Sequence, residues 1–226
     1  MTNRPDDDTL DSDGEAAGVL APDPTEAPHP DTGRKRPKPG ERRAQILQTL
    51  AGMLEQPGSE RVTTAALAAR LGVSEAALYR HFASKAQMFE GLIEFIESSV
   101  FTLVNQIVER EPSGLQQACK VVTLLLQFGE KNPGMTRVMV GDALVFEHDR
   151  LVARMNQFFD RIDSQLRQSL RSAGDAAGSL TASADANARA SVLTSFAVGR
   201  LQRYARSGFK RQPTEHLDAA LSLIVA

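Results

Sequence analysis

The sequence predicts an all-α protein with an N-terminal helix-turn-helix unit of three helices and a C-terminal helical dimerisation domain. Apolar residues recur every three or four positions over most of the chain after residue 41, and no segment shows the alternation of a strand. Cap and turn residues between 61 and 89 have the spacing of two short helices joined by a tight turn. We expect a tail and basic arm over 1–40, a DNA-binding domain over 41–88 and a dimerisation and partner-binding domain over 89–226.

The charges are divided unevenly along the chain. Residues 1–33 hold nine acidic residues, one arginine and five prolines, which predicts a disordered acidic tail. Residues 34–88 hold ten basic and four acidic residues, beginning with the basic arm Arg34-Lys35-Arg36-Pro37-Lys38-Pro39-Gly40. This positive excess favours DNA as a partner. The tail is either a solvated segment or a competitor of DNA for the basic region.

The first helix is predicted from Glu41 to Glu55. Arg42 and Arg43 lie in its first turn, where the helix dipole disfavours a positive charge. Phosphate contact would explain them, and a solvated run of charge is the alternative. The apolar face consists of Ile46, Leu47, Leu50 and Leu54.

The next two helices have clear start and stop signals. Thr63 and Thr64 are N-cap residues for a helix that stops at Gly72, which suits the left-handed conformation. Ser74 caps the second helix, which should end at His81 and enter a DNA major groove. The small core of this unit is predicted to contain Leu67, Leu71, Val73, Leu78 and Phe82.

Polar residues that could contact DNA gather on and around the second helix. Hydroxyl groups at the start of the first of these helices suit a phosphate, because backbone N–H groups there already favour an anion. Ser74, Ala76 and Arg80 are the candidates for base edges. The full set of predicted DNA-binding residues is Thr63, Thr64, Ser74, Ala76, Tyr79, Arg80, His81 and Lys85.

A long helix from Lys85 to Glu109 is predicted next, opened by a capping box from Ser84 to Gln87. Phe95 lies about 120° from the centre of its apolar stripe, which marks Phe95 as a possible partner contact or a core residue on the flank. The stripe is predicted to contain Phe89, Leu92, Ile93, Ile96, Val100, Leu103, Val104 and Ile107.

The remaining helices are predicted over 115–130, 135–144, 149–172, 185–207 and 214–225, with a flexible loop over 173–184. The near-heptad pattern of 149–172 is typical of a coiled coil. The last two helices are apolar enough for a four-helix dimer interface, and Ala190, Ala197 and Gly199 would allow close helix contact.

Composition and motifs argue against several classes of protein. No stretch of about 18 apolar residues is present, so we expect no membrane span. The acidic N-terminus is unlike a secretory signal, and the single Cys119 suits a reduced, cytoplasmic protein. No phosphate-binding glycine loop, G-x-S-x-G or H-E-x-x-H occurs, and the four histidines are scattered. We therefore expect no enzyme, metal or cofactor.

Several motifs carry a family resemblance. The segment V-T-T-A-A-L-A-A-R-L-G-V-S-E-A-A-L-Y-R-H-F-A-S-K resembles the DNA-binding domain of the TetR family, in which the Tyr, His and Lys lie against phosphates. Those residues are Tyr79, His81 and Lys85 here. The segments L-I-E-F-I-E, F-G-E-K-N-P-G-M-T-R and F-E-H-D-R-L are similar to the nucleoid occlusion factors within that family.

The resemblance implies a homodimer that binds palindromic double-stranded DNA on the nucleoid and inhibits assembly of the division protein FtsZ. It also implies an FtsZ-contacting surface made of Phe95, Leu124, Lys131 and Asn132. The chain departs from the family pattern at Leu103, where a basic residue is usual, at Gln127, where glycine is usual, and in its long acidic tail.

A ligand-controlled TetR-type transcriptional repressor is the alternative function. Such a repressor would need a cavity with convergent polar groups between helices 89–107, 115–130 and 151–170. The inward faces of these helices are nearly all aliphatic and aromatic, which favours a filled core.

Overall fold

The computed structural model describes residues 40–56 and 62–225, and all regular elements in these two ranges are helices. The predicted acidic tail and most of the basic arm lie outside the described residues. The division of the chain between residues 88 and 89 stays a prediction, and it coincides with a position inside a continuous helix, α4.

The three predicted N-terminal helices are confirmed as α1 (Glu41–Leu54), α2 (Thr64–Leu71) and α3 (Glu75–Tyr79). The side chains of Thr63 and Ser74 cap α2 and α3 as expected, and Gly72 ends α2 with a φ of 65°. The helix α3 ends two residues before the predicted end at His81, because the carbonyl of Leu78 accepts from both His81 and Phe82 in a closing turn. Leu67, Leu78 and Phe82 are buried, whereas Leu71 and Val73 are half-buried.

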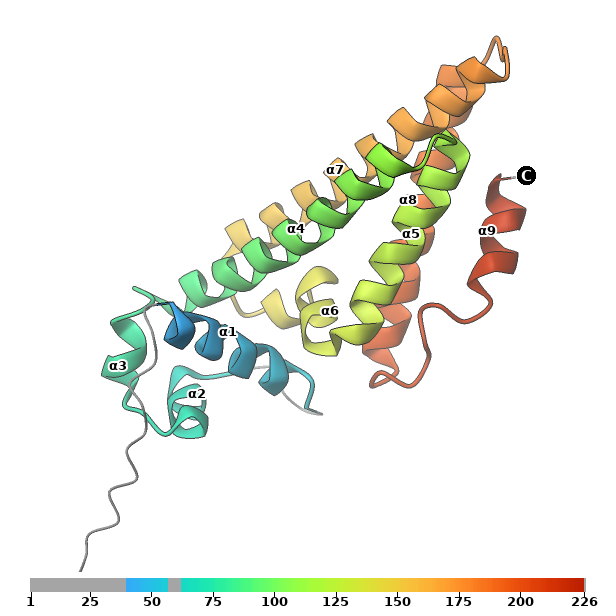
Figure 1. Cartoon of the computed structure of the whole chain (residues 1–226). Helices are drawn as coiled ribbons and strands as arrows, with labels where there is room; N and C mark the ends of the chain where they lie inside the picture. Colours follow the sequence, from blue (N-terminus) through green and yellow to red (C-terminus); the bar gives the residue numbers. More distant parts are fainter. Residues whose placement is uncertain (1–39, 57–61, 226) are drawn as a thin grey trace, which may run out of the picture. The chain divides into compact units, whose positions relative to one another are not determined.

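The long helix α4 (Lys85–Arg110) begins beside α1–α3 (Figure 1). Ser84 caps it, but Gln87 accepts from the backbone of Ala83 rather than of Ser84, so the predicted capping box is shifted by one residue. The apolar stripe packs against α1, α5 and α7. Leu103, predicted to belong to the buried stripe, is 41% exposed, because a groove opens beside it where α4 and α5 diverge.

The helix α4 is long and apolar enough, by length and composition, to cross a membrane. The buried residues of its stripe, from Phe89 to Val104, belong to the protein core. Such burial is what a core helix shows.

The helix α5 (Gly114–Lys131) is central, as predicted, and contacts α4, α7 and α8. The next helix, α6 (Pro133–Met139), begins at Pro133 rather than at the predicted Met135, because proline is well suited to the first helical position. A 3₁₀ turn, η1 (Asp142–Leu144), follows after Gly141. The predicted helix over 135–144 is therefore two short elements.

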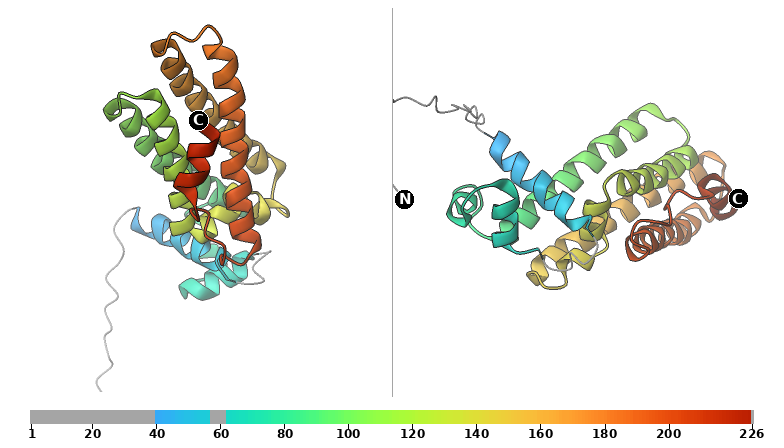
Figure 2. Two further views of the ribbon diagram at one scale, coloured as in Figure 1. Left: turned by 90° about the vertical axis from the view of Figure 1, so that its right-hand side faces the viewer. Right: turned by 90° about the horizontal axis from the view of Figure 1, so that it is seen from below.

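The chain ends in α7 (Asp149–Ala176), α8 (Ala182–Arg206) and α9 (Leu217–Val225), with α7 and α8 forming an antiparallel hairpin (Figures 1 and 2). The predicted flexible loop over 173–184 is wrong, since helix occupies all but residues 177–181. The small residues there serve close packing: a Cβ added to Gly174 would lie 2.8 Å from that of Ala182. Ala190 and Ala197 are buried, but nothing lies within 4 Å of a Cβ built on Gly199.

Candidate DNA interface and partner surface

The predicted DNA-binding residues lie together on α2, α3 and the start of α4. Tyr79 is 44% exposed, which is high for a large aromatic side chain in a folded protein. Thr64 and Lys85 are half-buried, and the exposed members are Thr63, Ser74, Ala76, Tyr79, Arg80 and His81. An exposed polar surface beside a capped short helix has the form of a major-groove reader.

Thr64 has a partner within the chain. Its hydroxyl donates a hydrogen bond of 2.6 Å to Oε2 of Glu75, at the start of α3. The hydroxyl can therefore donate to a phosphate only after it leaves this carboxylate. Glu75 is not among the predicted DNA-binding residues, although it directly follows the N-cap Ser74 and so lies on the recognition helix.

Lys85 also has a partner within the chain. Its ammonium group forms an ion pair with Glu147, in the segment between η1 and α7. The Glu147 side chain is only 9% exposed. No local pattern in the sequence indicates this pair, because the two residues are 62 positions apart.

Arg42 and Arg43 both have hydrogen-bond partners within the chain. Arg42 donates to Gln45 over 2.8 Å, within α1. Arg43 donates to the carbonyl oxygen of His81 over 3.0 Å and stacks on the ring of Phe82. These contacts give Arg43 a structural role within the DNA-binding unit, and its contact with a phosphate stays a prediction.

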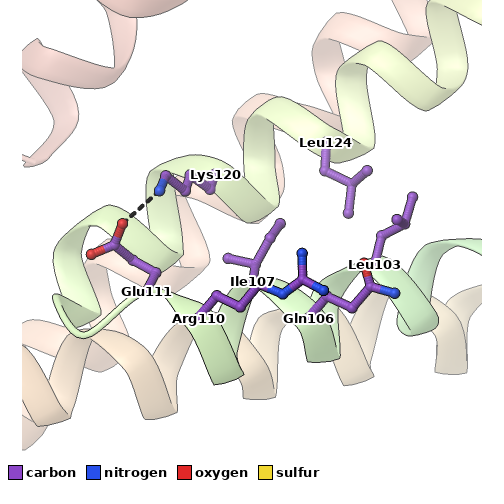
Figure 3. Close-up of a pocket in the computed structure, with 7 residues that line it drawn as sticks. All are labelled: Leu103, Gln106, Ile107, Arg110, Glu111, Lys120 and Leu124. Carbon is purple, nitrogen blue, oxygen red and sulfur yellow. Dashed lines mark hydrogen bonds and ion pairs between the residues drawn. The ribbon is translucent and has the colours of Figure 1, made fainter.

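A second surface lies near the C-terminal end of α4, where α4 and α5 diverge from the loop that joins them. A groove of about 280 Å³ opens there between the two helices (Figure 3). Leu103 and Leu124 face each other across it, and charged side chains surround its closed end. The residues that line it are Leu103, Gln106, Ile107, Arg110, Glu111, Lys120 and Leu124.

An ion pair closes one end of this groove. Nζ of Lys120 lies 2.5 Å from Oε2 of Glu111. The hydrogen bond from Lys120 and the backbone hydrogen bond from Ser113 both lower the pKa of Glu111 from its ordinary value of 4.5. The pair is therefore charged at neutral pH.

Of the four predicted partner residues, Leu124 lines this groove, and Phe95, Lys131 and Asn132 lie outside it. Phe95 is 48% exposed, so its predicted position off the core stripe is confirmed. It lies eleven residues before Gln106, or about 20° away around α4. On α5, Leu124 lines the groove and the exposed Lys131 follows seven residues later, again about 20° away. The Asn132 amide donates to the carbonyl of Phe128 over 2.7 Å, which gives it a role in ending α5.

Other reactive groups offer little chemistry. Burial raises the pKa of the Cys119 thiol above its ordinary value of 9.0, so the thiol stays protonated at neutral pH. Within residues 40–56 and 62–225, no three His, Cys, Asp or Glu side chains group as metal ligands.

The family comparisons agree with this arrangement of a DNA-binding unit and a helical domain. Residues 46–92 match the family described as bacterial regulatory proteins, tetR family. Residues 113–226 match the tetracyclin repressor-like, C-terminal domain of the SlmA-like type.

Solved structures show the same fold at low identity. The fatty acid degradation regulator FadR from Bacillus halodurans superposes with a TM-score of 0.68 at 12% identity, over 83% of this chain and 96% of its own. The transcriptional regulator FadR from Bacillus subtilis, solved in complex with stearoyl-CoA, has a TM-score of 0.64 at 14% identity, over 81% and 97%. The fold is that of the TetR-type helix-turn-helix regulators.

Sequence relatives narrow the class. The nucleoid occlusion factor SlmA of Alteromonas mediterranea is 52% identical over 177 residues, which is 78% of this chain and 90% of the relative. SlmA of Photobacterium profundum is 52% identical over 186 residues, or 82% and 94%. The chain belongs to the SlmA family of nucleoid occlusion factors within the TetR family.

Proposed function

We propose that this protein binds palindromic double-stranded DNA as a homodimer and inhibits FtsZ assembly over the nucleoid, so that division follows chromosome segregation. The observation that carries the proposal is the 52% identity to SlmA proteins over at least 90% of their length. DNA binding would take place through α2, α3 and the start of α4.

Exposed apolar residues on the last helices support a homodimer. Val192 on α8 is 51% exposed and Leu223 on α9 is 83% exposed. A second copy would cover such side chains in a four-helix interface. Two recognition helices would then meet half-sites about 34–36 Å apart.

The surface on α4 and α5 is where we place FtsZ. Its apolar members Phe95, Leu103 and Leu124 supply area that a partner can bury. Lys131 adds a basic group for an acidic partner. An exposed aromatic side chain such as Phe95 suits a binding hot spot. Leu103 makes the groove more apolar than a basic residue at that position would.

The ligand-controlled repressor has less support. It requires a cavity among α4, α5 and α7, yet the inward side chains there form the core: Ile93, Ile96, Val121, Val122 and Phe158 are fully buried. Aliphatic packing of this kind offers few convergent polar groups to a ligand.

Sedimentation of FtsZ polymers tests the proposed function. Polymers are assembled with GTP and pelleted with this protein, in the presence and absence of a palindromic duplex selected by the protein. We expect less pelleted FtsZ when protein and duplex are both present. An unchanged pellet, with DNA binding intact, would favour a repressor that does not act on FtsZ.

A further inference from the structure

The ammonium group of Lys85 is held inside the chain. It forms its ion pair with Glu147 and lies 5.6 Å from the centroid of the Phe89 ring, one turn further along α4. Only 25% of the Lys85 side chain is exposed. The Lys85 ammonium group therefore points along α4 toward Phe89 and Glu147. It would have to leave Glu147 to contact a phosphate at the start of the helix.

The Lys85–Glu147 pair is the first of three ion pairs on α4, and the other two are made by α7. Arg150 pairs with Glu90 over 2.8 Å, and Arg154 pairs with Glu97 over 2.6 Å. The side chain of Glu147 is 9% exposed, against 32% for Glu90 and 19% for Glu97. Of the three carboxylates, that of Glu147 is the least exposed to water. Loss of its cationic partner would therefore cost the most free energy at Glu147.

The residues just before Glu147 are apolar and exposed. Val145 is 69% exposed and Phe146 is 65% exposed, although both lie just before Glu147, whose side chain is nearly buried. The segment over 145–147 is therefore held by the Glu147 side chain and by the backbone hydrogen bond from Glu147 to Leu144, while its apolar side chains are exposed.

We propose that Glu147 competes with DNA phosphate for Lys85, and that DNA binding transfers the ammonium group from this carboxylate to a phosphate. The proposal rests on the proposed DNA-binding function and concerns how that function is regulated. Glu147 affects the affinity for DNA only through Lys85. In the absence of DNA its carboxylate occupies the ammonium group that a phosphate would otherwise bind.

Repulsion between the two anions determines whether Glu147 and a phosphate compete for Lys85 or bind it together. An ammonium group has three donors, so it could contact both anions only if a phosphate came next to the carboxylate. Two like charges at such a distance repel each other, most strongly where water is excluded. Transfer leaves a poorly solvated carboxylate behind, and that cost is subtracted from the affinity for DNA.

The coupling is reciprocal. DNA that removes Lys85 loosens the 145–147 segment, and anything that moves this segment away frees Lys85 for DNA. Loss of the anchor would let Val145 and Phe146 change position together with Glu147.

The test uses Glu147→Gln with Glu90→Gln as the matched control. Both substitutions remove one negative charge from the same side of the chain, but Glu90 pairs with Arg150 instead of Lys85. Binding to a mixed-sequence duplex is measured over a range of salt concentrations, because phosphate contact does not depend on sequence. The melting temperature of each variant is recorded to confirm that it is folded.

We expect Glu147→Gln to bind more tightly than Glu90→Gln by about five-fold for each chain of the dimer, because each chain no longer has to break an ion pair of about 1 kcal/mol. The slope of log K against log salt should be the same for both variants, because Lys85 neutralises a phosphate in each, and Lys85→Ala should lower it by about 0.9 for each chain. In a Lys85→Ala background, Glu147→Gln should lose this advantage over Glu90→Gln.

Equal affinities for Glu147→Gln and Glu90→Gln, or weaker binding by Glu147→Gln, would overturn the proposal. Weaker binding would mean that Glu147 positions Lys85 for DNA. If Glu147→Gln does not fold, Glu147→Asp, which draws the carboxylate back by one methylene, is expected to bind more tightly than wild type and is read in the same way. If the wild type itself fails to bind duplex DNA, the proposed function fails instead.

Discussion

The guanidinium group of Arg43 lies 4.1 Å from the centroid of the Phe82 ring. Its Nη1 also donates to the carbonyl oxygen of His81, which ties α1 to the turn that follows the recognition helix. The contact fixes the C-terminal end of α3 and places Arg43 among the residues that shape the DNA-binding unit.

Arg43→Ala should therefore act on stability. We expect a loss of about 1 kcal/mol in the free energy of unfolding, from one exposed cation–π contact and one hydrogen bond. Urea unfolding measures it. The salt dependence of DNA binding should not change, whereas a slope lower by about one would show that Arg43 contacts a phosphate.

Arg80→Ala should change sequence preference. Arg80 is exposed at the end of α3, where a guanidinium group can reach a base edge. We expect a loss of about 1–3 kcal/mol for the selected palindrome and little change for a scrambled duplex. An equal loss on both duplexes would assign Arg80 to the phosphate backbone.

Gly134→Ala should separate α6 from α1. A Cβ at this position would lie 2.0 Å from the carbonyl oxygen of Ala51, which neither helix can accommodate without moving. We expect the protein to lose about 2 kcal/mol or more of stability. Gly52→Ala, in open space on α1, is the control and should stabilise the helix by up to about 1 kcal/mol. Equal effects of the two variants would contradict the close approach.

The Glu111–Lys120 pair gives stability a pH dependence. Because Lys120 and Ser113 lower the pKa of Glu111 in the folded state, the pair's contribution is present above the unfolded value of 4.5. That contribution is lost as pH falls through the lower, folded pKa. The difference in melting temperature between wild type and Glu111→Gln should therefore shrink as pH falls below 4.5. A difference that persists at the lowest pH would point to packing.

Local signals in the sequence predicted the helix-turn-helix unit well. Caps such as Thr63 and Ser74 act on neighbouring residues, so their effect can be read without the fold. The angle of Phe95 from the apolar stripe is likewise a property of one helix, and the exposure of Phe95 agrees with it.

Tertiary contacts account for the predictions that were wrong. The glycine and alanine residues at 173–184 indicated a loop, but their small size serves the close contact of Gly174 with Ala182. The contact of Arg43 with Phe82, 39 positions later, could likewise not be inferred from local charge. Leu103 is apolar like a core residue but lies at the surface. Its exposure follows from the divergence of α4 and α5, which the sequence pattern of one helix does not indicate.

Phe95→Ala and Lys131→Ala should separate DNA binding from action on FtsZ. Phe95 is 48% exposed, so its truncation should lower the free energy of unfolding by no more than about 1 kcal/mol. A loss of about 3 kcal/mol or more would show that Phe95 is a core residue, in which case its activity would say nothing about a partner.

The most direct test is FtsZ sedimentation with Phe95→Ala, in the presence of the selected palindromic duplex. Leu180→Ala is the control, because Leu180 is a fully exposed apolar residue between α7 and α8. We predict that wild type and Leu180→Ala reduce the pelleted FtsZ equally, and that Phe95→Ala binds the duplex normally but leaves the pellet unchanged. A folded, DNA-binding Phe95→Ala variant that reduces the pellet as wild type does would contradict the placement of FtsZ on the surface of α4 and α5.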